Sequence, residues 1–306
     1  MTRRELLAAG AACATPLFGA RSHFDKTRIS AITDEIGKST DEAIAFAHKY
    51  GLSFIEIRNL PGKGEYFKLP EPEIKAEALR FQQEGLKVSF VNTSLMKFTW
   101  PGMEAARLRH ETPEAKERRL ASEKTRWDNR IEDLKKAIRC AHIMGCDKVR
   151  VFAGTRVADV NAVYSKIAEV IGGEMAAVCE KEKVYLVLEN EGSQNVASSQ
   201  EIVDILKKMP SKWVGFNWDP HNAPKEVAYP DAYHLLPKKR MLNVQIKGKN
   251  VMPASAEKQD WKGIMQALER DGYKGKLGLE THIFDGTLIA AAHVSMEEIM
   301  RIVREL

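Results

Sequence analysis

The sequence predicts a single parallel (β/α)8 TIM barrel, and three observations carry that prediction. Short apolar segments alternate with helical segments along the chain, many helical segments end just before a glycine, and several apolar segments finish in a carboxylate or amide. The chain has 306 residues, of which 44% are hydrophobic, and a barrel of this kind uses roughly 250 residues around one core. We therefore expect one barrel domain, at 28–306.

Eight segments have the composition of buried parallel strands, being short and rich in Val, Ile, Leu and Phe. They begin near Ile29, Phe54, Val88, Val149, Val184, Val214, Leu242 and Leu277. Eight strand and helix units favour a closed barrel over a doubly wound sheet, whose first turn carries a glycine-rich phosphate loop. No such loop follows the first segment, at 29–32.

Helical periodicity appears between the strand segments, and glycine follows many of the predicted helices. Glycine adopts at little cost the left-handed conformation that ends a helix. The clearest helical patterns are at 39–50, 72–84, 126–144, 162–182, 199–208 and 261–271, and the glycines are Gly51, Gly85, Gly145 and Gly272. The repeated order of helix, glycine and strand is typical of a parallel sheet.

The stretch at 92–148 is longer than one helix requires. Its first part, at 97–102, is aromatic and broken by Pro-Gly, and the part at 104–123 is densely charged. We interpret the stretch as a βα-loop insertion over the mouth of the barrel, where lids and substrate contacts lie in this fold. For the charged run alone, a solvated surface helix without a role is the alternative.

Arg3 and Arg4 precede a run of small residues at 8–14. This order is typical of a twin-arginine export signal, which we expect at 1–22, so that the mature protein is periplasmic or secreted. An amphipathic N-terminus without a targeting role and lipid attachment at Cys13 are the alternatives. No later segment reaches the ~20 consecutive apolar residues that span a bilayer, so we expect no membrane span.

Composition argues against a nucleic-acid partner. The chain has 47 Lys and Arg against 42 Asp and Glu, a net charge of +5, and the two signs are interleaved. Cys140, Cys146 and Cys179 lie beyond the N-terminal segment. None has the spacing of metal ligands, and we expect Cys140 and Cys146 to be buried.

Four predicted strands end in, or just before, side chains with oxygen donors. Alternation along each strand places these groups inside the barrel at its carboxyl end, where active sites of this fold lie. They are Glu189, Asp219, Gln245 and Glu280. An isolated carboxylate in a low-dielectric interior is very unfavourable, so three converging carboxylates need a cation. A surface salt bridge would explain any one of these acids alone, and the metal site is predicted because all of them close neighbouring strands.

Oxygen donors also indicate which metal the site would take. Carboxylate and amide oxygens suit hard cations, so we expect one divalent ion, Mn²⁺ first and Mg²⁺ second. Co²⁺ or catalytic Zn²⁺ are alternatives if His221 or His282 joins the ligands.

Residues 28–304 resemble the sugar phosphate isomerase/epimerase superfamily, also called xylose isomerase-like barrels. The motifs that carry the resemblance are Leu-Glu-Asn at 188–190, Trp-Asp-Pro at 218–220, Val-Gln-Ile-Lys at 244–247, and Asp-Trp-Lys-Gly at 260–263, followed by Gly-Tyr at 272–273 and Gly-Leu-Glu at 278–280. The resemblance implies one divalent metal held by Glu189, Asp219, position 245 and Glu280, and a homo-oligomer, since relatives are often dimers or tetramers.

The chain departs from the family pattern at two positions. Position 245 is Gln where relatives have His, and position 191 is Glu where many relatives have His. An amide oxygen donates less electron density than imidazole, which favours a harder metal such as Mn²⁺ or Mg²⁺. These departures argue against a standard ketose epimerase specificity.

The chemistry that the resemblance implies is proton transfer through an enediolate of a metal-chelated keto-sugar. Glu189 and Glu280 would act as base and acid, and Lys247 would stabilise the enediolate oxygen. The candidates for substrate contacts are His221, Glu56, Asn92, Trp100, Arg150 and His282. For His221, His282 and Lys247, structural hydrogen bonding at the rim is the alternative.

The leading expectation is therefore a metal-dependent sugar isomerase or epimerase with a small carbohydrate substrate. A lyase that acts on 3-keto-glycosides would use the same metal and carboxylates, so the sequence barely separates the two. A sugar-binding barrel that has lost catalysis is a third hypothesis. Abasic-site endonucleases share the architecture but need a three-metal cluster with several histidines, which the strand ends of this chain do not supply.

Overall fold

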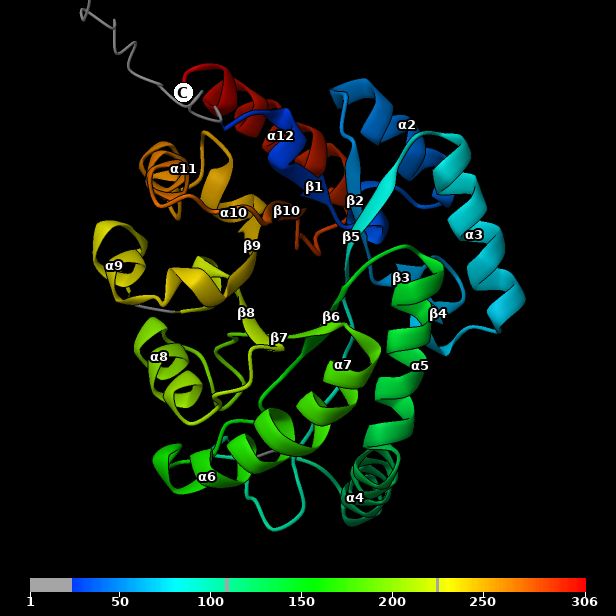
Figure 1. Cartoon of the computed structure of the whole chain (residues 1–306), viewed down its shortest axis with the longest axis vertical. Coiled ribbons are helices and arrows are strands. Elements are labelled where there is room, and N and C mark those ends of the chain that lie inside the picture. The colour runs from blue at the N-terminus through cyan, green and yellow to red at the C-terminus, as the bar shows by residue number, and fades with distance from the viewer. Residues whose placement is uncertain (1–23, 108–109, 224–225) are drawn as a thin grey trace, which may run out of the picture.

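Eight parallel strands form a nearly closed barrel in the computed structural model, which describes residues 24–107, 110–223 and 226–306 (Figure 1). The predicted (β/α)8 barrel is confirmed, whereas the predicted export segment at 1–22 and Cys13 lie outside the described residues. The barrel strands are β1 (Ile29–Ala31), β2 (Phe54–Ile57), β5 (Lys87–Val91), β6 (Lys148–Val151), β7 (Tyr185–Glu189), β8 (Val214–Trp218), β9 (Met241–Lys247) and β10 (Lys276–Glu280).

The strands follow one another around the barrel in chain order, apart from the small hairpin of β3 (Asn59–Leu60) and β4 (Gly64–Glu65). The sheet order runs β1-β10-β9-β8-β7-β6-β5-β2, and a parallel bridge between Ile32 and Glu56 joins its two edges. All neighbouring strands are parallel. Their carboxyl ends therefore meet at one mouth, as the sequence analysis required.

Helices surround the strands, as Figure 1 shows. Apolar faces explain their position: α11 presents Trp261, Ile264 and Leu268 to the core, and α12 presents Met296 and Ile299. The α-helices are α1 (Thr33–Ile36), α2 (Thr40–Tyr50), α3 (Glu71–Gln83), α4 (Pro113–Asp128), α5 (Arg130–Ile143), α6 (Tyr164–Ile167), α7 (Ala176–Glu182), α8 (Ser199–Lys207), α9 (Tyr233–Leu235), α10 (Gly248–Val251), α11 (Trp261–Arg270) and α12 (Leu288–Arg304).

Shorter helical segments complete the chain. The 3₁₀ segments are Lys26–Arg28, Tyr66–Lys68, Asn161–Val163, Pro220–Asn222 and Lys238–Arg240, and the π segments are Ala168–Met175 and Ala228–Ala232. The helix predicted at 162–182 is therefore continuous but widens into a π segment in its middle.

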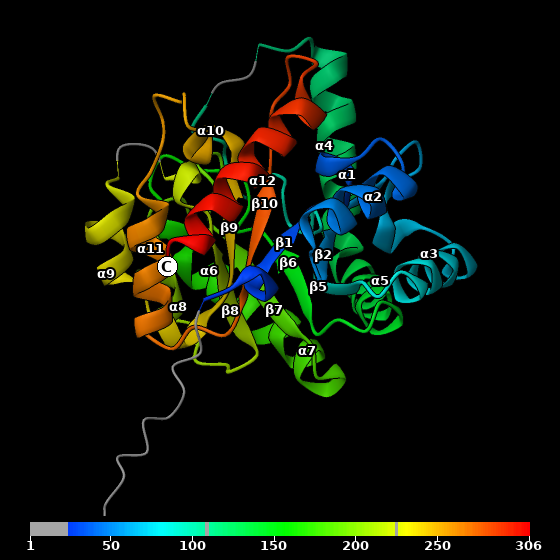
Figure 2. The same ribbon diagram turned by 90° about the horizontal axis from the view of Figure 1, so that it is seen from above.

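The predicted insertion contains two helices, because α4 includes the second half of the charged run and the predicted helix at 126–144 begins only at Arg130. Thr112 caps α4 by accepting from the backbone N–H of Ala115, and Pro113 occupies its first turn. In Figure 2, α4 lies at the same end of the strands as α10, which directly follows β9. Arg126 of α4 donates to the backbone oxygen of Ser94 (3.0 Å), just after β5.

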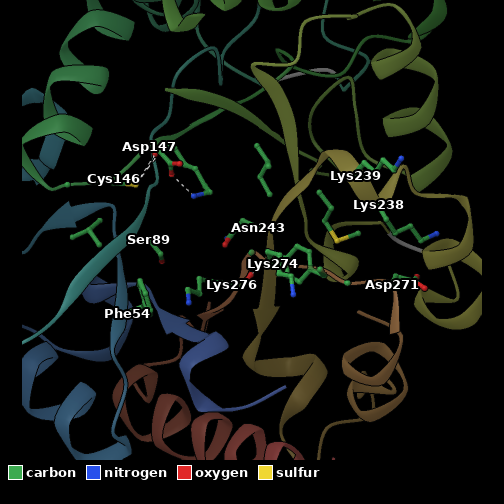
Figure 3. A pocket seen from close by; sticks show the side chains of 18 of the residues that line it. Phe54, Ser89, Cys146, Asp147, Lys238, Lys239, Asn243, Asp271, Lys274 and Lys276 are labelled. Carbon is green, nitrogen blue, oxygen red and sulfur yellow. Dashed lines mark hydrogen bonds and ion pairs between the residues drawn. The ribbon is translucent and has the colours of Figure 1, made fainter. Parts of the chain in front are cut away.

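A cavity of about 850 Å³ lies at the opposite end of the barrel, where several strands begin (Figure 3). Phe54, Lys148 and Lys276 are the first residues of their strands and line it. It is thus separated from the carboxyl ends of the strands by the length of the barrel.

Cys140, Cys146 and Cys179 are buried thiols, as expected for the first two. Burial raises the pKa of each to about 12. Among the described residues, no helix has the length and apolarity needed to cross a membrane.

Candidate active site

Three buried carboxylates meet at the end of the barrel where the strands finish. Glu189 ends β7, Asp219 directly follows β8 and Glu280 ends β10. Their exposed fractions are 2%, 0% and 4%, and one oxygen of each lies within 4.8 Å of the others. The structure thus brings together the three carboxylates that were predicted to be metal ligands.

Asn190 holds Asp219 in place through the backbone. Its Oδ1 accepts from the N–H of Asp219 (2.8 Å), and its Nδ2 donates to the backbone oxygens of Asp219 and Ala197 (2.9 Å each). The Asp219 carboxylate in turn uses Oδ1 to accept from the N–H groups of His221 (2.9 Å) and Asn222 (3.3 Å). Oδ2 of Asp219 is therefore the oxygen left for the centre of the site.

Each carboxylate of the site also contacts a cationic side chain. The Lys247 ammonium lies 2.6 Å from Glu280 Oε2 and 3.3 Å from Asp219 Oδ2. The guanidinium of Arg150 lies 3.0 Å from Glu189 Oε2, and that of Arg58 lies 3.0 Å from Glu280 Oε1. Each buried carboxylate of the site thus has a cationic partner, as buried charges require, and Arg58 also contacts Asp34 and Glu35.

Burial and these cations shift the ionisation of the site in different directions. Burial raises the pKa of Asp219 to about 7, because it outweighs the opposing effect of Lys247. Burial also opposes ionisation of Glu280, but Lys247, a hydrogen bond with His282, Arg58 and Arg150 together hold its pKa well below the usual range. Burial disfavours the charged form of Lys247 as well, yet Glu280 and Asp219 raise its pKa. Perturbations of this kind are concentrated at functional sites.

The donor atoms fit a divalent cation. Gln245 Oε1 is buried and accepts no hydrogen bond from any described residue, whereas the buried Asp219 Oδ2 and Glu280 Oε2 contact only the Lys247 ammonium among the described cations. Oxygens of carboxylate and amide type are the donors that Mg²⁺ and Mn²⁺ prefer. The residues that would hold the ion are Glu189, Asp219, Glu280 and Gln245.

A second group of potential ligand atoms shares Glu280. Atoms of Glu35, Glu280 and His282 lie within 4.8 Å of one another. The Arg58 guanidinium, however, contacts Glu35 Oε1 (2.6 Å) as well as Glu280 Oε1. Ion pairs account for this group, and we assign no metal to it.

Beneath the carboxylates, polar side chains fill the barrel around Glu56. This carboxylate is 0% exposed, and burial raises its pKa although its hydrogen bonds oppose the shift. It accepts from Ser30 Oγ (2.8 Å), Asn92 Nδ2 (2.9 Å), Gln245 Nε2 (2.9 Å) and Asn243 Nδ2 (3.2 Å). Glu56 and Asn92, which were predicted as substrate contacts, therefore lie buried inside the barrel, hydrogen-bonded to each other.

A pocket of about 290 Å³ opens above the carboxylates. It brings together the predicted residues Arg150, Glu189, Lys247, Glu280 and His282. Its lining also includes Glu191, one of the two departures from the family pattern, and six residues that the sequence analysis did not single out, namely Arg58, Asn59, Glu65, Ser94, Lys97 and Asn222.

Two further predicted contacts lie away from this pocket. Trp100 is 1% exposed, packs against Trp127 with ring centroids 5.4 Å apart, and donates to the backbone oxygen of Met96 (3.2 Å). It supports the loop rather than the pocket wall. His221 is half-buried, with Nδ1 3.6 Å from Glu257 Oε2, and it does not line the pocket.

Arg58 is the most informative residue that the sequence analysis missed. It directly follows β2 and contacts Asp34, Glu35 and Glu280. Its position one residue after a strand was a usable signal, since Glu56 on the same strand was already a candidate. Nothing in the sequence indicated that Arg58, and not Glu56, reaches the mouth.

A family model for xylose isomerase-like TIM barrels matches residues 44–305. The fold is similar to a 3-keto-D-glucoside 4-epimerase from E. coli in its apo form, with 14% identity and a TM-score of 0.65 over 92% of this chain and 100% of that one. An L-ribulose 3-epimerase has 16% identity and a TM-score of 0.64, over 91% of this chain and 96% of that one.

A third similar structure is a xylose isomerase-like TIM barrel protein from Mycobacterium smegmatis in complex with magnesium. It has 13% identity and a TM-score of 0.65, over 92% of this chain and 99% of that one. No curated protein matches the chain. The family match covers most of the sequence and confirms the resemblance seen in its motifs, so the chain belongs to the xylose isomerase-like TIM barrel family.

Proposed function

We propose that the protein is a divalent-metal-dependent sugar isomerase or epimerase that transfers a proton at the carbon beside a keto group. The observation that carries the proposal is the group of three buried carboxylates within 4.8 Å at the barrel mouth. Similar folds described as a 3-keto-D-glucoside 4-epimerase and an L-ribulose 3-epimerase support a keto-sugar substrate.

When bound, the divalent ion supplies a Lewis acid that acidifies the hydrogen next to the carbonyl. Glu189 and Glu280 would carry the proton, and they stand on β7 and β10 with two strands between them. Glu189 uses Oε2 to accept from Arg150 (3.0 Å) and Asn217 (2.7 Å). These two bonds hold the carboxylate in one orientation, as a positioned acid or base requires.

Cationic side chains would stabilise negative charge that develops on the substrate oxygens. Lys247 and Arg58 both contact Glu280 and both line the pocket. A positive group that is already oriented in a water-poor site lowers the energy of an oxyanion without reorganisation. Lys97, paired with Glu191 (2.5 Å), lies on another part of the same wall.

Mn²⁺ is the metal that we propose, because the four candidate ligands offer only oxygen. Mg²⁺, Co²⁺ and Zn²⁺ are the competitors to be measured beside it. Export through the segment at 1–22 and assembly into a homo-oligomer are likewise proposals, which fractionation of the native host and light scattering would test.

The lyase hypothesis shares the first step, which is removal of a proton beside a keto group. The fold's similarity to a 3-keto-D-glucoside 4-epimerase favours testing 3-keto-glycosides together with ketoses. Deuterium incorporation from D₂O into recovered substrate reports proton transfer in either case. Release of the aglycone identifies a lyase, and exchange or a new stereoisomer without release identifies an epimerase or isomerase.

The first experiment is elemental analysis of the purified protein after loading with Mn²⁺, beside Asp219→Asn and Glu280→Gln. We expect about one Mn²⁺ per chain, lost in both variants, because each variant replaces a charged ligand with an amide. Glu257→Gln is the control, since Glu257 is an exposed acid that pairs with Lys249 (3.7 Å) and His221 near the mouth. A wild-type protein without bound metal would rule out the proposed chemistry and favour a sugar-binding barrel.

A further inference from the structure

Glu56 is a buried carboxylate that forms no ion pair with any described residue, although its neighbours provide four hydrogen bonds. All four neighbours act as donors: Ser30, Asn92, Asn243 and Gln245. The two oxygens share these donors equally, with Ser30 and Asn243 on Oε1 and Asn92 and Gln245 on Oε2. The side chain at position 56 therefore acts only as a hydrogen-bond acceptor, and none of these four neighbours accepts a bond from it.

The bond from Gln245 determines which way its amide faces. A glutamine side chain has one acceptor end and one donor end in a single plane. Because Nε2 donates to Glu56 (2.9 Å), the acceptor Oε1 must point elsewhere, and it is buried without a hydrogen bond from any described residue. A buried amide oxygen without a donor is costly unless a cation or water meets it.

The register of the strands places Gln245 next to the residues of the carboxylate site. Gln245 pairs with Gly278 across β9 and β10, and the next inward pair along the two strands is Lys247 with Glu280. Gln245 therefore lies one inward position below the residues that contact one another at the mouth.

Gly278 leaves the space that the carboxylate and the amide occupy. A Cβ at this position would lie 2.0 Å from Glu56 Oε1 and 2.6 Å from Gln245 Oε1, closer than real side chains approach. The small residue on β10 is thus required by the contact between Glu56 and Gln245.

We propose that Glu56 is a positioning residue that turns the amide oxygen of Gln245 toward the divalent ion, and so makes Gln245 a ligand. This inference rests on the metal site of the proposed function and adds the residue that orients one of its ligands. Carboxylates that accept from the far side of a metal ligand set its orientation and increase its donor strength.

The expected effect of Glu56→Gln follows from the four donors. A glutamine at position 56 would place an NH₂ donor among four neighbours that also donate. At least one neighbour must then rotate so that it accepts a hydrogen bond instead. If the Gln245 amide rotates, its NH₂ group faces the ion in place of its oxygen, and an NH₂ group does not coordinate a cation. Loss of such an orienting partner typically weakens metal binding about 10–100-fold.

A histidine at 245 would give a second test, independent of the first variant. One ring nitrogen can donate to Glu56 while the other faces the site, so the same carboxylate would orient an imidazole. Imidazole suits Zn²⁺ and Co²⁺ better than Mn²⁺ or Mg²⁺. We expect Gln245→His to move the preference of the site toward Zn²⁺, and Glu56→Gln in that background to reverse much of the gain.

The experiment is titration calorimetry with Mn²⁺ and Zn²⁺ on the wild type, Glu56→Gln, Gln245→His and the double variant. Circular dichroism establishes folding. Glu77→Gln is the matched control, because Glu77 is also a buried acid (8% exposed) that accepts from neighbours, but it lies on α3. We expect its Mn²⁺ affinity to equal that of the wild type.

The outcomes separate the two proposals. A wild type that binds no Mn²⁺ overturns the proposed function and this inference with it. A wild type that binds Mn²⁺, with unchanged affinity in Glu56→Gln, overturns the role of Glu56 alone. If Glu56→Gln does not fold, Gln245→His decides, because an unaltered ratio of Zn²⁺ to Mn²⁺ affinity means that position 245 does not reach the ion.

Discussion

The Lys247 ammonium lies 2.6 Å from Glu280 Oε2, at the centre of the carboxylates proposed to bind a divalent ion. A cation there competes electrostatically with the metal. We expect Lys247→Met to bind Mn²⁺ about tenfold more tightly, a gain of about 1.4 kcal/mol, because the competing charge is removed. The same variant should lose most of its activity, since Lys247 is proposed to stabilise the substrate oxyanion.

Calorimetric titration with Mn²⁺ measures this effect. Lys97→Met is its control, because Lys97 lines the same pocket but pairs with Glu191, and its Mn²⁺ affinity should not change. Weaker Mn²⁺ binding by Lys247→Met would mean that the lysine holds the carboxylates together for the ion instead of competing with it.

Arg150 is the buried partner of Glu189, and its replacement should lower the free energy of unfolding. Arg150→Met leaves the Glu189 carboxylate buried with Asn217 as its remaining hydrogen-bond donor in the described parts of the chain. Removing one partner of a buried ion pair costs about 3–5 kcal/mol of unfolding free energy. Urea denaturation measures it, and Arg156→Met is the control because its ion pair with Glu201 (2.7 Å) is partly exposed. The control should lose about 1 kcal/mol or less, and equal losses in both variants would contradict the prediction.

The Asn190 side chain forms three hydrogen bonds, two with the backbone of Asp219 and one with the backbone oxygen of Ala197. We expect Asn190→Ala to lower the free energy of unfolding by about 2–3 kcal/mol and to weaken Mn²⁺ binding, because Asp219 loses its backbone support. Asn195→Ala is a matched control, since Asn195 is also buried and bonds to the backbone of Ala153 and Val157 (2.9 Å each). The control should lose similar stability but keep its Mn²⁺ affinity, which thermal melts and calorimetry would show.

Lys276, in the cavity of Figure 3, gives a prediction about pH. Burial lowers its pKa from 10.5 to about 8, and Arg28 and Lys148 add to the effect. The folded pKa lies below the unfolded one, so between about pH 8 and 10.5 the unfolded chain binds more protons and stability rises with pH. Below pH 8 the cost of the buried charge is fully present.

Lys276→Met should remove that cost and flatten the dependence of stability on pH. The variant also loses the bond to the backbone oxygen of Thr27 (2.6 Å), so the pH dependence is the decisive quantity. We expect its stability relative to the wild type to fall by about 1 kcal/mol between pH 7 and 10, after solvent screening. Lys274→Met, at an exposed lysine of the same cavity, should keep the wild-type dependence, and parallel profiles for all three proteins would contradict the prediction.

The parts of the fold that the sequence predicted are those that local pattern controls. The eight apolar segments form eight parallel strands, as predicted. They could be predicted because hydrophobic periodicity and the residues that end helices depend on only a few neighbouring positions. The convergence of Glu189, Asp219 and Glu280 followed as well, since carboxyl ends of parallel strands share one mouth.

Local pattern did not predict which polar side chains line the pocket. Glu56 lies on β2 and Arg58 directly follows it. Because the two are separated by one residue, side-chain alternation predicts that both point inward. The first lies wholly inside the barrel with four donors, whereas the second reaches Glu280 at the mouth. Depth along the barrel separates them, and depth depends on the stagger of neighbouring strands, which the sequence of one strand does not specify.

By itself, the sequence determined the barrel, the end of it that carries the carboxylates, and the family motifs around them. Only the tertiary structure decided that Lys247 stands between Asp219 and Glu280, that Arg58 and Arg150 pair with the same site, and that Glu56 receives the amide of Gln245. The physical reason is that strand identity depends on neighbours along the chain. Charge pairing and amide orientation, in contrast, depend on side chains that meet from strands as far apart in sequence as β2 and β9, whose residues Glu56 and Gln245 are separated by 189 positions.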